Sequence, residues 1–207
     1  MSALFVPSPL GALLLREDAG RLAEVAFVSP TFSPETPFEQ ELAAARRFDA
    51  QPLAAARLNA VDVKTQPLAA ARLNAVNVLT PESLGAPKTP PILRRAAAQL
   101  AEYFAGTRTR FDLPLAPVGT EFQRRVWVAT SAIKFGETAT YGEIARKIGV
   151  PNGSRAVGGA LNRNPLAIVV PCHRVVGSSG KLTGYDGGVD RKAFLLNLER
   201  PEPPRLF

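Results

Sequence analysis

Residues 140–176 read TYGEIARKIGVPNGSRAVGGALNRNPLAIVVPCHRVV and contain most of the signals for the fold of the C-terminal half of this chain. The first part of this stretch predicts a short helix, because Thr140 and Glu143 have the spacing of a capping box and Gly149 suits a helix end. A second helix is predicted to begin at Ser154 after a tight turn. Two short helices so joined, with an arginine near the start of the second, are typical of a helix-turn-helix, although two packed core helices would give the same pattern.

The rest of this stretch leads to the chain's only cysteine. The Asn-Pro pair at 164–165 ends the second helix, since proline disfavours α geometry in the residue before it. Ala167–Val170 predicts a buried strand that runs on into the extended segment Pro171–Val176. Five glycines between residues 177 and 188 require a loop, and a last helix is expected at about 190–199.

The N-terminal half predicts a small sheet with a helix. Leu10–Leu15 and Leu22–Val28 are apolar runs around a turn-forming stretch at 18–21, which indicates a hairpin. Residues 90–105 have apolar positions on one face, as in an amphipathic helix.

Residues 107–118 are polar and then contain prolines, and we place a domain boundary there. The expected domains are residues 1–115, an α/β unit, and residues 116–207, a mainly helical unit that begins with a helix at about 120–134.

Residues 51–65 (QPLAAARLNAVDVKT) are almost repeated in residues 66–80 (QPLAAARLNAVNVLT). Two copies of this length do not make a solenoid, which needs at least three stacked units of about 20 residues or more. Both copies cannot occupy one place in a fold, so part of 51–80 is expected to be a surface excursion with little role in chemistry.

Charge is distributed unevenly between the two halves. The net charge is +7, yet residues 1–115 hold 12 basic and 11 acidic residues whereas residues 116–207 hold 13 and 7. A basic half suggests a polyanionic partner, most simply nucleic acid, although a basic surface kept for solubility would look the same. With no long apolar stretch and no leader pattern, we expect a soluble, cytoplasmic protein that is not bound to membranes.

The only cysteine, Cys172, is followed directly by the only histidine, His173. Single copies exclude an internal disulfide and a zinc site built from several Cys and His ligands, and we expect neither metal nor cofactor. A lone cysteine is usually a small buried hydrophobe, but a neighbouring histidine can help to form the reactive thiolate. Adjacent side chains of an extended segment point to opposite faces, so a bridging water is an alternative to direct contact.

Glu199 lies four residues after Leu195, on or beside the apolar face of the last helix. A carboxylate there is costly unless it is paired. Pairing with His173 would raise the pKa of the imidazole and fix its tautomer; the alternative is that Glu199 lies at the frayed, solvent-exposed helix end.

The segment VPCHRVV (170–176) resembles the active-site signature of the methylated-DNA–protein-cysteine methyltransferases, also called O6-alkylguanine-DNA alkyltransferases. The resemblance extends over residues 121–145, 155–165 and 184–188. It implies a ribonuclease-H-like N-terminal sheet with a helix and a mostly helical C-terminal domain with a helix-turn-helix, an α+β unit followed by an α unit.

The resemblance also implies roles for individual residues. Cys172 would accept the alkyl group and His173, through a water, would take its proton. Glu199 would orient the histidine, and Asn164 would tie the turn to the active-site segment. Further residues would contact DNA or the flipped base: Tyr141, which can also donate a proton toward guanine N3, Arg155, which would fill the gap left by that base, and Gln123, Gly159, Val175, Ser178 and Gly187.

The implied function is direct-reversal DNA repair. The chain would transfer the alkyl group of O6-methylguanine, and of O4-methylthymine, irreversibly to Cys172 after binding the minor groove of double-stranded DNA and flipping the base. The expected form is a monomer, with cooperative assembly on DNA left open. Two rivals are a helix-turn-helix protein that binds alkylated DNA without chemistry, and a cysteine hydrolase that uses Cys172 and His173.

Overall fold

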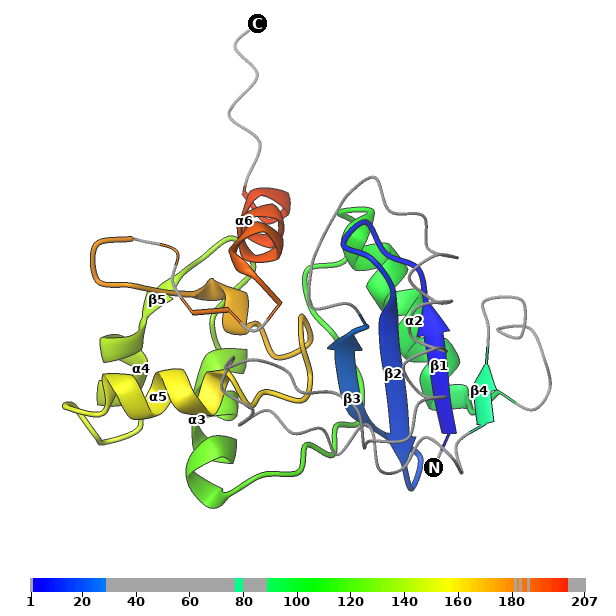
Figure 1. Ribbon diagram of the computed structural model, residues 1–207, viewed down its shortest axis with the longest axis horizontal. Helices are drawn as coiled ribbons and strands as arrows, with labels where there is room; N and C mark the ends of the chain where they lie inside the picture. The colour runs from blue at the N-terminus through cyan, green and yellow to red at the C-terminus, as the bar shows by residue number, and fades with distance from the viewer. Residues whose placement is uncertain are drawn as a thin grey trace, which may run out of the picture.

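The computed structural model describes residues 2–28, 77–79, 89–180, 182, 184–185 and 187–200. Within these residues, an N-terminal sheet with one helix lies beside a mainly helical C-terminal part (Figure 1). The coarse architecture expected from the sequence is therefore confirmed. Most of the tandem repeat lies outside the described residues, but Asn77–Leu79 of its second copy form the strand β4.

The N-terminal sheet has the strand order β3-β2-β1-β4. The predicted hairpin is present, although its first strand lies about three residues later than expected and the sequence did not indicate β1. Neighbouring strands are antiparallel except β1 and β4, which are parallel. Besides β4, the strands are β1 (Ser2–Val6), β2 (Leu13–Asp18) and β3 (Arg21–Phe27).

Helix α2 (Pro91–Phe104) packs on one face of this sheet, as its apolar periodicity predicted. Pro91 stands in its first turn, where the missing N–H removes no helical hydrogen bond. Leu93 and Tyr103 are fully buried on its inner face. Tyr103 lies in the last turn, so its hydroxyl reaches from the N-terminal unit toward the C-terminal one.

The described residues of the C-terminal part form four α-helices and a parallel pair of short strands. The capping box predicted at Thr140 and Glu143 is present, and a second one at Thr120 and Gln123 begins α3. The helices are α3 (Glu121–Ser131), α4 (Tyr141–Lys147), α5 (Ser154–Leu161) and α6 (Val189–Leu198), and the strands are β5 (Ala139–Thr140) and β6 (Val175–Val176). In the described part of the chain, every helix is too short or too polar to cross a membrane.

The segment before the cysteine is not the strand that the apolar run Ala167–Val170 predicted. The Val169 amide donates to the Ala167 carbonyl at 2.8 Å across Ile168, whose φ is +70°, as in the rare, strained form of the γ-turn. Cys172 itself begins a 3-10 turn, Cys172–Arg174, so the expected extended geometry at Cys172 and His173 is also wrong. Burial was predicted correctly, but the prolines at 165 and 171 interrupt regular pairing.

The outer edge of β3 holds this strained segment. The Val25 amide donates to the Pro165 carbonyl at 2.8 Å, and the Val25 carbonyl accepts from the Ala167 amide at 2.9 Å. Further along the same edge, Leu22 forms two hydrogen bonds with the interdomain segment, one to Pro114 and one to Ala116. The β3 edge of the N-terminal sheet is thus covered by the interdomain segment and by residues of the C-terminal unit, and hydrogen bonds join the two units there.

The indole of Trp127 ties α3 to α5, and this tie supports a stability prediction. Its Nε1 donates to the Ala160 carbonyl at 2.9 Å in a buried environment. Trp127→Phe removes this buried hydrogen bond, while the Ala160 carbonyl keeps the amide of Arg163 at 3.2 Å. We therefore expect the free energy of unfolding to fall by about 1 kcal/mol, the net contribution of one such hydrogen bond. Urea unfolding followed by circular dichroism measures the loss. Val128→Ala, at an exposed position of the same helix, is the control and should change stability by under about 0.5 kcal/mol; equal effects would contradict the account.

Candidate active site

The carboxylate of Glu199, directly after α6, is buried and accepts hydrogen bonds from four residues. His173 Nε2 lies 2.8 Å from Oε1, although His173 precedes Glu199 by 26 positions in the sequence. Arg174 donates from Nε to Oε2 at 2.7 Å and from Nη2 to Oε1 at 2.9 Å. The Tyr103 hydroxyl donates to Oε1 at 2.6 Å, and the Gly136 amide to Oε2 at 3.4 Å. The predicted pairing of Glu199 with His173 is therefore present, and the frayed, exposed alternative is wrong.

These donors keep Glu199 ionised. Burial alone would raise the pKa of its carboxyl, but the hydrogen bonds from His173 and Arg174, with the further contributions of Tyr103 and nearby positive charge, outweigh burial and lower the pKa to about 2. An ionised carboxylate only accepts hydrogen bonds. Nε2 of His173 must therefore carry the proton of their shared bond, which leaves Nδ1 as the basic nitrogen of the ring.

The Nδ1 atom of His173 is buried and has no hydrogen-bond partner among the described residues. The pKa of His173 is lowered, because complete burial penalises the charged imidazolium more than the hydrogen bond and charge of Glu199 favour it. The pairing with Glu199 does raise this pKa, as expected, but the effect of burial is larger and the net shift is downward. A neutral imidazole with a free Nδ1 lone pair is suited to accept a proton.

Cys172 is half-buried and its sulfur has a defined neighbour. Asn164 Nδ2 lies 3.2 Å from Sγ and 2.9 Å from the Val170 carbonyl, while Asn164 Oδ1 accepts from the Leu166 amide at 3.0 Å. Asn164 thus joins the end of the α5 region to the segment that carries the thiol. A donor beside Sγ favours the thiolate over the thiol.

Lys192, on α6, was not found by reasoning from the sequence. It is fully buried, and its Nζ donates to the Val175 carbonyl at 2.6 Å. Burial lowers the pKa of its ammonium, and the negative charge that Cys172 can carry opposes this shift. The same ammonium lies 5.9 Å from the centre of the Tyr141 ring, so it joins the cysteine segment to α4.

A second group of predicted residues lines an open hollow of about 320 Å³ on the helical face. Tyr141, at the start of α4, and Arg155, at the start of α5, meet there. The Tyr141 hydroxyl donates to the Gly184 carbonyl at 3.4 Å, and a Cβ built on Gly158 would lie 3.7 Å from the Tyr141 ring. The hollow is lined by Tyr141, Ser154, Arg155, Gly158, Asn162 and Gly184.

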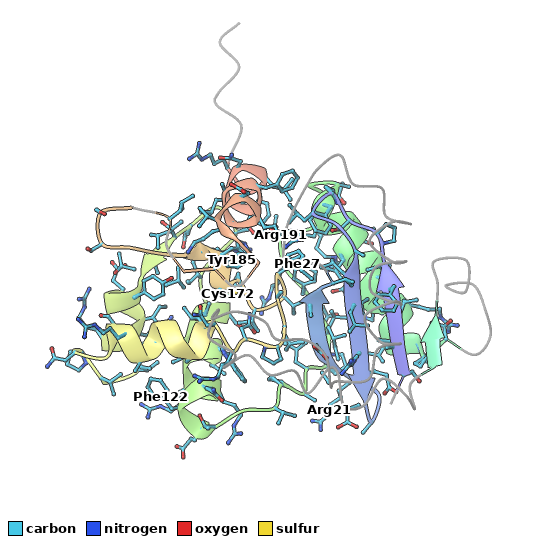
Figure 2. The ribbon with its side chains drawn as sticks, viewed as in Figure 1. Arg21, Phe27, Phe122, Cys172, Tyr185 and Arg191 are labelled. Atoms are coloured by element: carbon cyan, nitrogen blue, oxygen red, sulfur yellow. The ribbon has the colours of Figure 1, made fainter. Side chains whose placement is uncertain are left out.

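The other predicted contact residues are more scattered. The side chain of Gln123 accepts from the Thr120 amide at 2.8 Å and so caps α3. The Val175 carbonyl is engaged by Lys192, Ser178 is exposed, and Gly187 packs against the ring of Phe27. Figure 2 shows Cys172 on the side of the helical part that faces the N-terminal sheet.

Comparison with known proteins covers both halves of the chain. Residues 3–117 match a family model described as the ribonuclease-like domain of 6-O-methylguanine DNA methyltransferase, and residues 121–201 match its DNA binding domain. A methylated-DNA–protein-cysteine methyltransferase of Methanosarcina acetivorans is 63% identical over 106 residues, which are 51% of this chain and 68% of that one.

Solved structures are similar over almost the whole chain. The crystal structure of Mycobacterium tuberculosis O6-methylguanine methyltransferase has a TM-score of 0.67 and 36% identity, and the match covers 99% of this chain and 96% of that one. A structure of OGT from the same organism in complex with DNA has the same TM-score and identity, with 97% and 93% covered.

The only histidine makes the protonation of this site directly measurable. An NMR titration of His173 should give a pKa below the usual value of about 6.5. Because the folded chain then binds this proton less readily than the unfolded chain, His173 should make the free energy of unfolding fall as the pH drops through about 6.5. In Glu199→Gln the favourable negative charge is lost, so the pKa of His173 should fall further. A pKa at or above the usual value in the unaltered protein would contradict this account.

Proposed function

Since the chain belongs to the methylated-DNA–protein-cysteine methyltransferase family, we propose that it repairs DNA by moving the alkyl group of O6-methylguanine to the sulfur of Cys172. The observation that carries the proposal is the arrangement around the thiol: Cys172 precedes a buried, neutral His173, which is held by the ionised Glu199. The chain binds DNA, and it acts by direct reversal of the damage.

The proton of the thiol has a defined destination in this proposal. A water between Sγ and His173 Nδ1 passes the proton to the imidazole, which becomes an imidazolium stabilised by Glu199. The ammonium of Lys192 and the amide of Asn164 favour the thiolate that remains. The positive charge of Arg174 opposes protonation of His173 and so favours release of this proton afterwards.

The transfer itself is a single displacement. The thiolate forms an S–C bond with the methyl carbon, the bond from that carbon to O6 breaks, and its electrons stay on guanine. Tyr141 donates a proton at N3 and so neutralises the guanine. The imidazolium releases to solvent the proton that it took from the thiol. The Tyr141 oxygen takes up a proton from solvent, which restores its hydroxyl. The protein therefore ends with neutral His173 and S-methylcysteine.

Access to the base requires that it leave the stack, because O6 of a paired guanine faces the inside of the duplex. We assign α4 and α5 to a helix-turn-helix that binds the minor groove, with Arg155 filling the gap of the flipped base. Gly158 and Gly159 permit close approach of the α5 backbone to DNA. Gln123, Val175, Ser178 and Gly187 are assigned to contacts with the DNA or the base, and the N-terminal sheet with α2 to a ribonuclease-H-like fold.

Each copy of the protein acts once under this proposal. S-methylcysteine is a thioether without an easy leaving group, and the chain has no second cysteine to regenerate Cys172. The reaction as written uses no cofactor or metal. We assign the substrate to O6-alkylguanine in double-stranded DNA, with O4-methylthymine as a second substrate, and the acting form to a cytoplasmic monomer; cooperative assembly on DNA stays a separate hypothesis.

The alternative of a binder without chemistry is not favoured. A protein that only binds alkylated DNA needs no activated thiol, whereas here Cys172 is accompanied by Asn164, His173 and Lys192. The hydrolase alternative would form a thioester on Cys172, which water cleaves, and so predicts repeated turnover on an ester or amide instead of one transfer per chain.

Cys172→Ala separates repair from binding. With duplex DNA that contains O6-methylguanine, the unaltered chain should restore one guanine per protein molecule and then stop, as measured by chromatography of the digested DNA. Cys172→Ala should restore none and still bind DNA, with an affinity that falls as salt rises. Many guanines restored per chain would support an enzyme with turnover, and binding by the unaltered chain without any repair would support the simple binder.

Arg155→Ala tests the proposed helix role. The variant should repair duplex DNA about tenfold more slowly, because flipping costs a few kcal/mol that Arg155 partly offsets. Its reaction with free O6-benzylguanine, which needs no flipping, should be nearly unchanged. Arg163→Ala removes the same charge beyond the end of α5 and serves as the control for phosphate attraction. Equal losses on duplex DNA and on the free base would exclude the gap-filling role.

A further inference from the structure

Arg191 is fully buried at the junction of the two units, although it takes no part in the proton path described above. Its Nε donates to the carbonyl of Leu10 at 3.1 Å, in the turn between β1 and β2. Its Nη1 donates to the carbonyl of Gly187 at 3.0 Å. The guanidinium carbon lies 4.4 Å from the centre of the Phe27 ring, at the end of β3. One side chain of α6 therefore contacts two parts of the N-terminal sheet and the loop before α6.

This loop is packed tightly against the N-terminal sheet at Gly187. A Cβ built there would lie 2.7 Å from a carbon of the Tyr185 ring and 3.0 Å from two carbons of the Phe27 ring. Figure 2 shows Phe27, Tyr185 and Arg191 at the junction of the two units. A few residues earlier, Gly184 accepts the hydrogen bond of Tyr141. The loop is thus held by α4 on one side and by Arg191 with Phe27 on the other.

Arg191 and Lys192 are neighbours on α6 and point in different directions, as consecutive helical residues do. Lys192 donates to the Val175 carbonyl behind the cysteine, whereas Arg191 donates to Leu10 and Gly187. A buried guanidinium is costly unless its donors are satisfied, and its planar fork suits two acceptors and an aromatic face at once. Arginine therefore suits this set of contacts between the two units better than lysine would.

We propose that Arg191 is a positioning residue for the substrate. Arg191 holds Gly187 and Tyr185 of the loop in place against Phe27 and Leu10 of the N-terminal unit. These loop residues form the wall of the pocket that contacts the flipped base and its alkyl group. The N-terminal unit therefore influences how well substrates bind. This inference rests on the proposed function, and it concerns binding of the base rather than activation of the thiol.

Saturation kinetics with free O6-benzylguanine test the inference on the full-length protein. Arg191→Leu should raise the half-saturating concentration about tenfold, the size expected for loss of a charged hydrogen bond. Its limiting rate, and the rate at which iodoacetamide alkylates Cys172, should stay unchanged. Arg191→Lys should have a half-saturating concentration between those of Arg191→Leu and the unaltered chain, because an ammonium keeps the charge but lacks the planar fork. Arg200→Leu, at an exposed arginine just beyond α6, is the matched control and should behave as the unaltered chain.

Phe27→Leu provides a second route if Arg191→Leu does not fold. It keeps most of the volume but removes the aromatic face, so it should also raise the half-saturating concentration and leave the iodoacetamide rate unchanged. An unchanged half-saturating concentration in Arg191→Lys and Phe27→Leu, or parallel losses in benzyl transfer and iodoacetamide reaction, would overturn the positioning role. Failure of the unaltered chain to take the benzyl group on Cys172 would instead overturn the proposed function.

Discussion

The buried carboxylate of Glu199 is the group on which the rest of the site depends. It follows α6 directly, yet it accepts hydrogen bonds from the cysteine segment through His173 and Arg174, and from the N-terminal unit through Tyr103. Removing one partner of such a buried ion pair costs about 3–5 kcal/mol, a large part of the stability of about 5–15 kcal/mol of an ordinary domain. The tautomer of His173 therefore depends on this charge, which also forms one of the contacts between the two units.

The N-terminal unit contacts the candidate site around Cys172 at three separate points. Tyr103 binds the carboxylate, Val25 holds the segment before the cysteine, and Phe27 stacks on Arg191. The second contact bears on the strained backbone at Ile168, since a positive φ in a β-branched residue costs about 1–3 kcal/mol. Hydrogen bonds between Val25 and the residues before Ile168 help to hold this geometry, and the γ-turn in turn directs the chain toward Cys172.

Features that depend only on residues close together in the sequence were predicted correctly. The capping box at Thr140, the start of α5 at Ser154 and the inward position of Glu199 after α6 all follow from short spacings, and the structure has them. Helices α3 and α5 end about three residues earlier than predicted. The strand expected at Ala167–Val170 was wrong because an apolar run indicates burial but not backbone geometry, which here depends on pairing with distant Val25. The net lowering of the pKa of His173 could not be predicted, because the extent of its burial depends on the whole fold. Lys192 could have been found, since it lies on the same helical stripe as Leu195 and Glu199, whereas Arg191 has its acceptor 181 positions away at Leu10.

The sulfur of Cys172 is the atom that should receive the alkyl group from DNA. Mass spectrometry of the tryptic peptide 164–174, after reaction with duplex DNA containing O6-methylguanine, identifies the atom that carries the group. We expect this peptide to gain the mass of one CH2 group, located on Cys172 by fragmentation, in every reacted chain. A peptide of unchanged mass, or a methyl group on another residue, while the guanine in the DNA is restored, would contradict it.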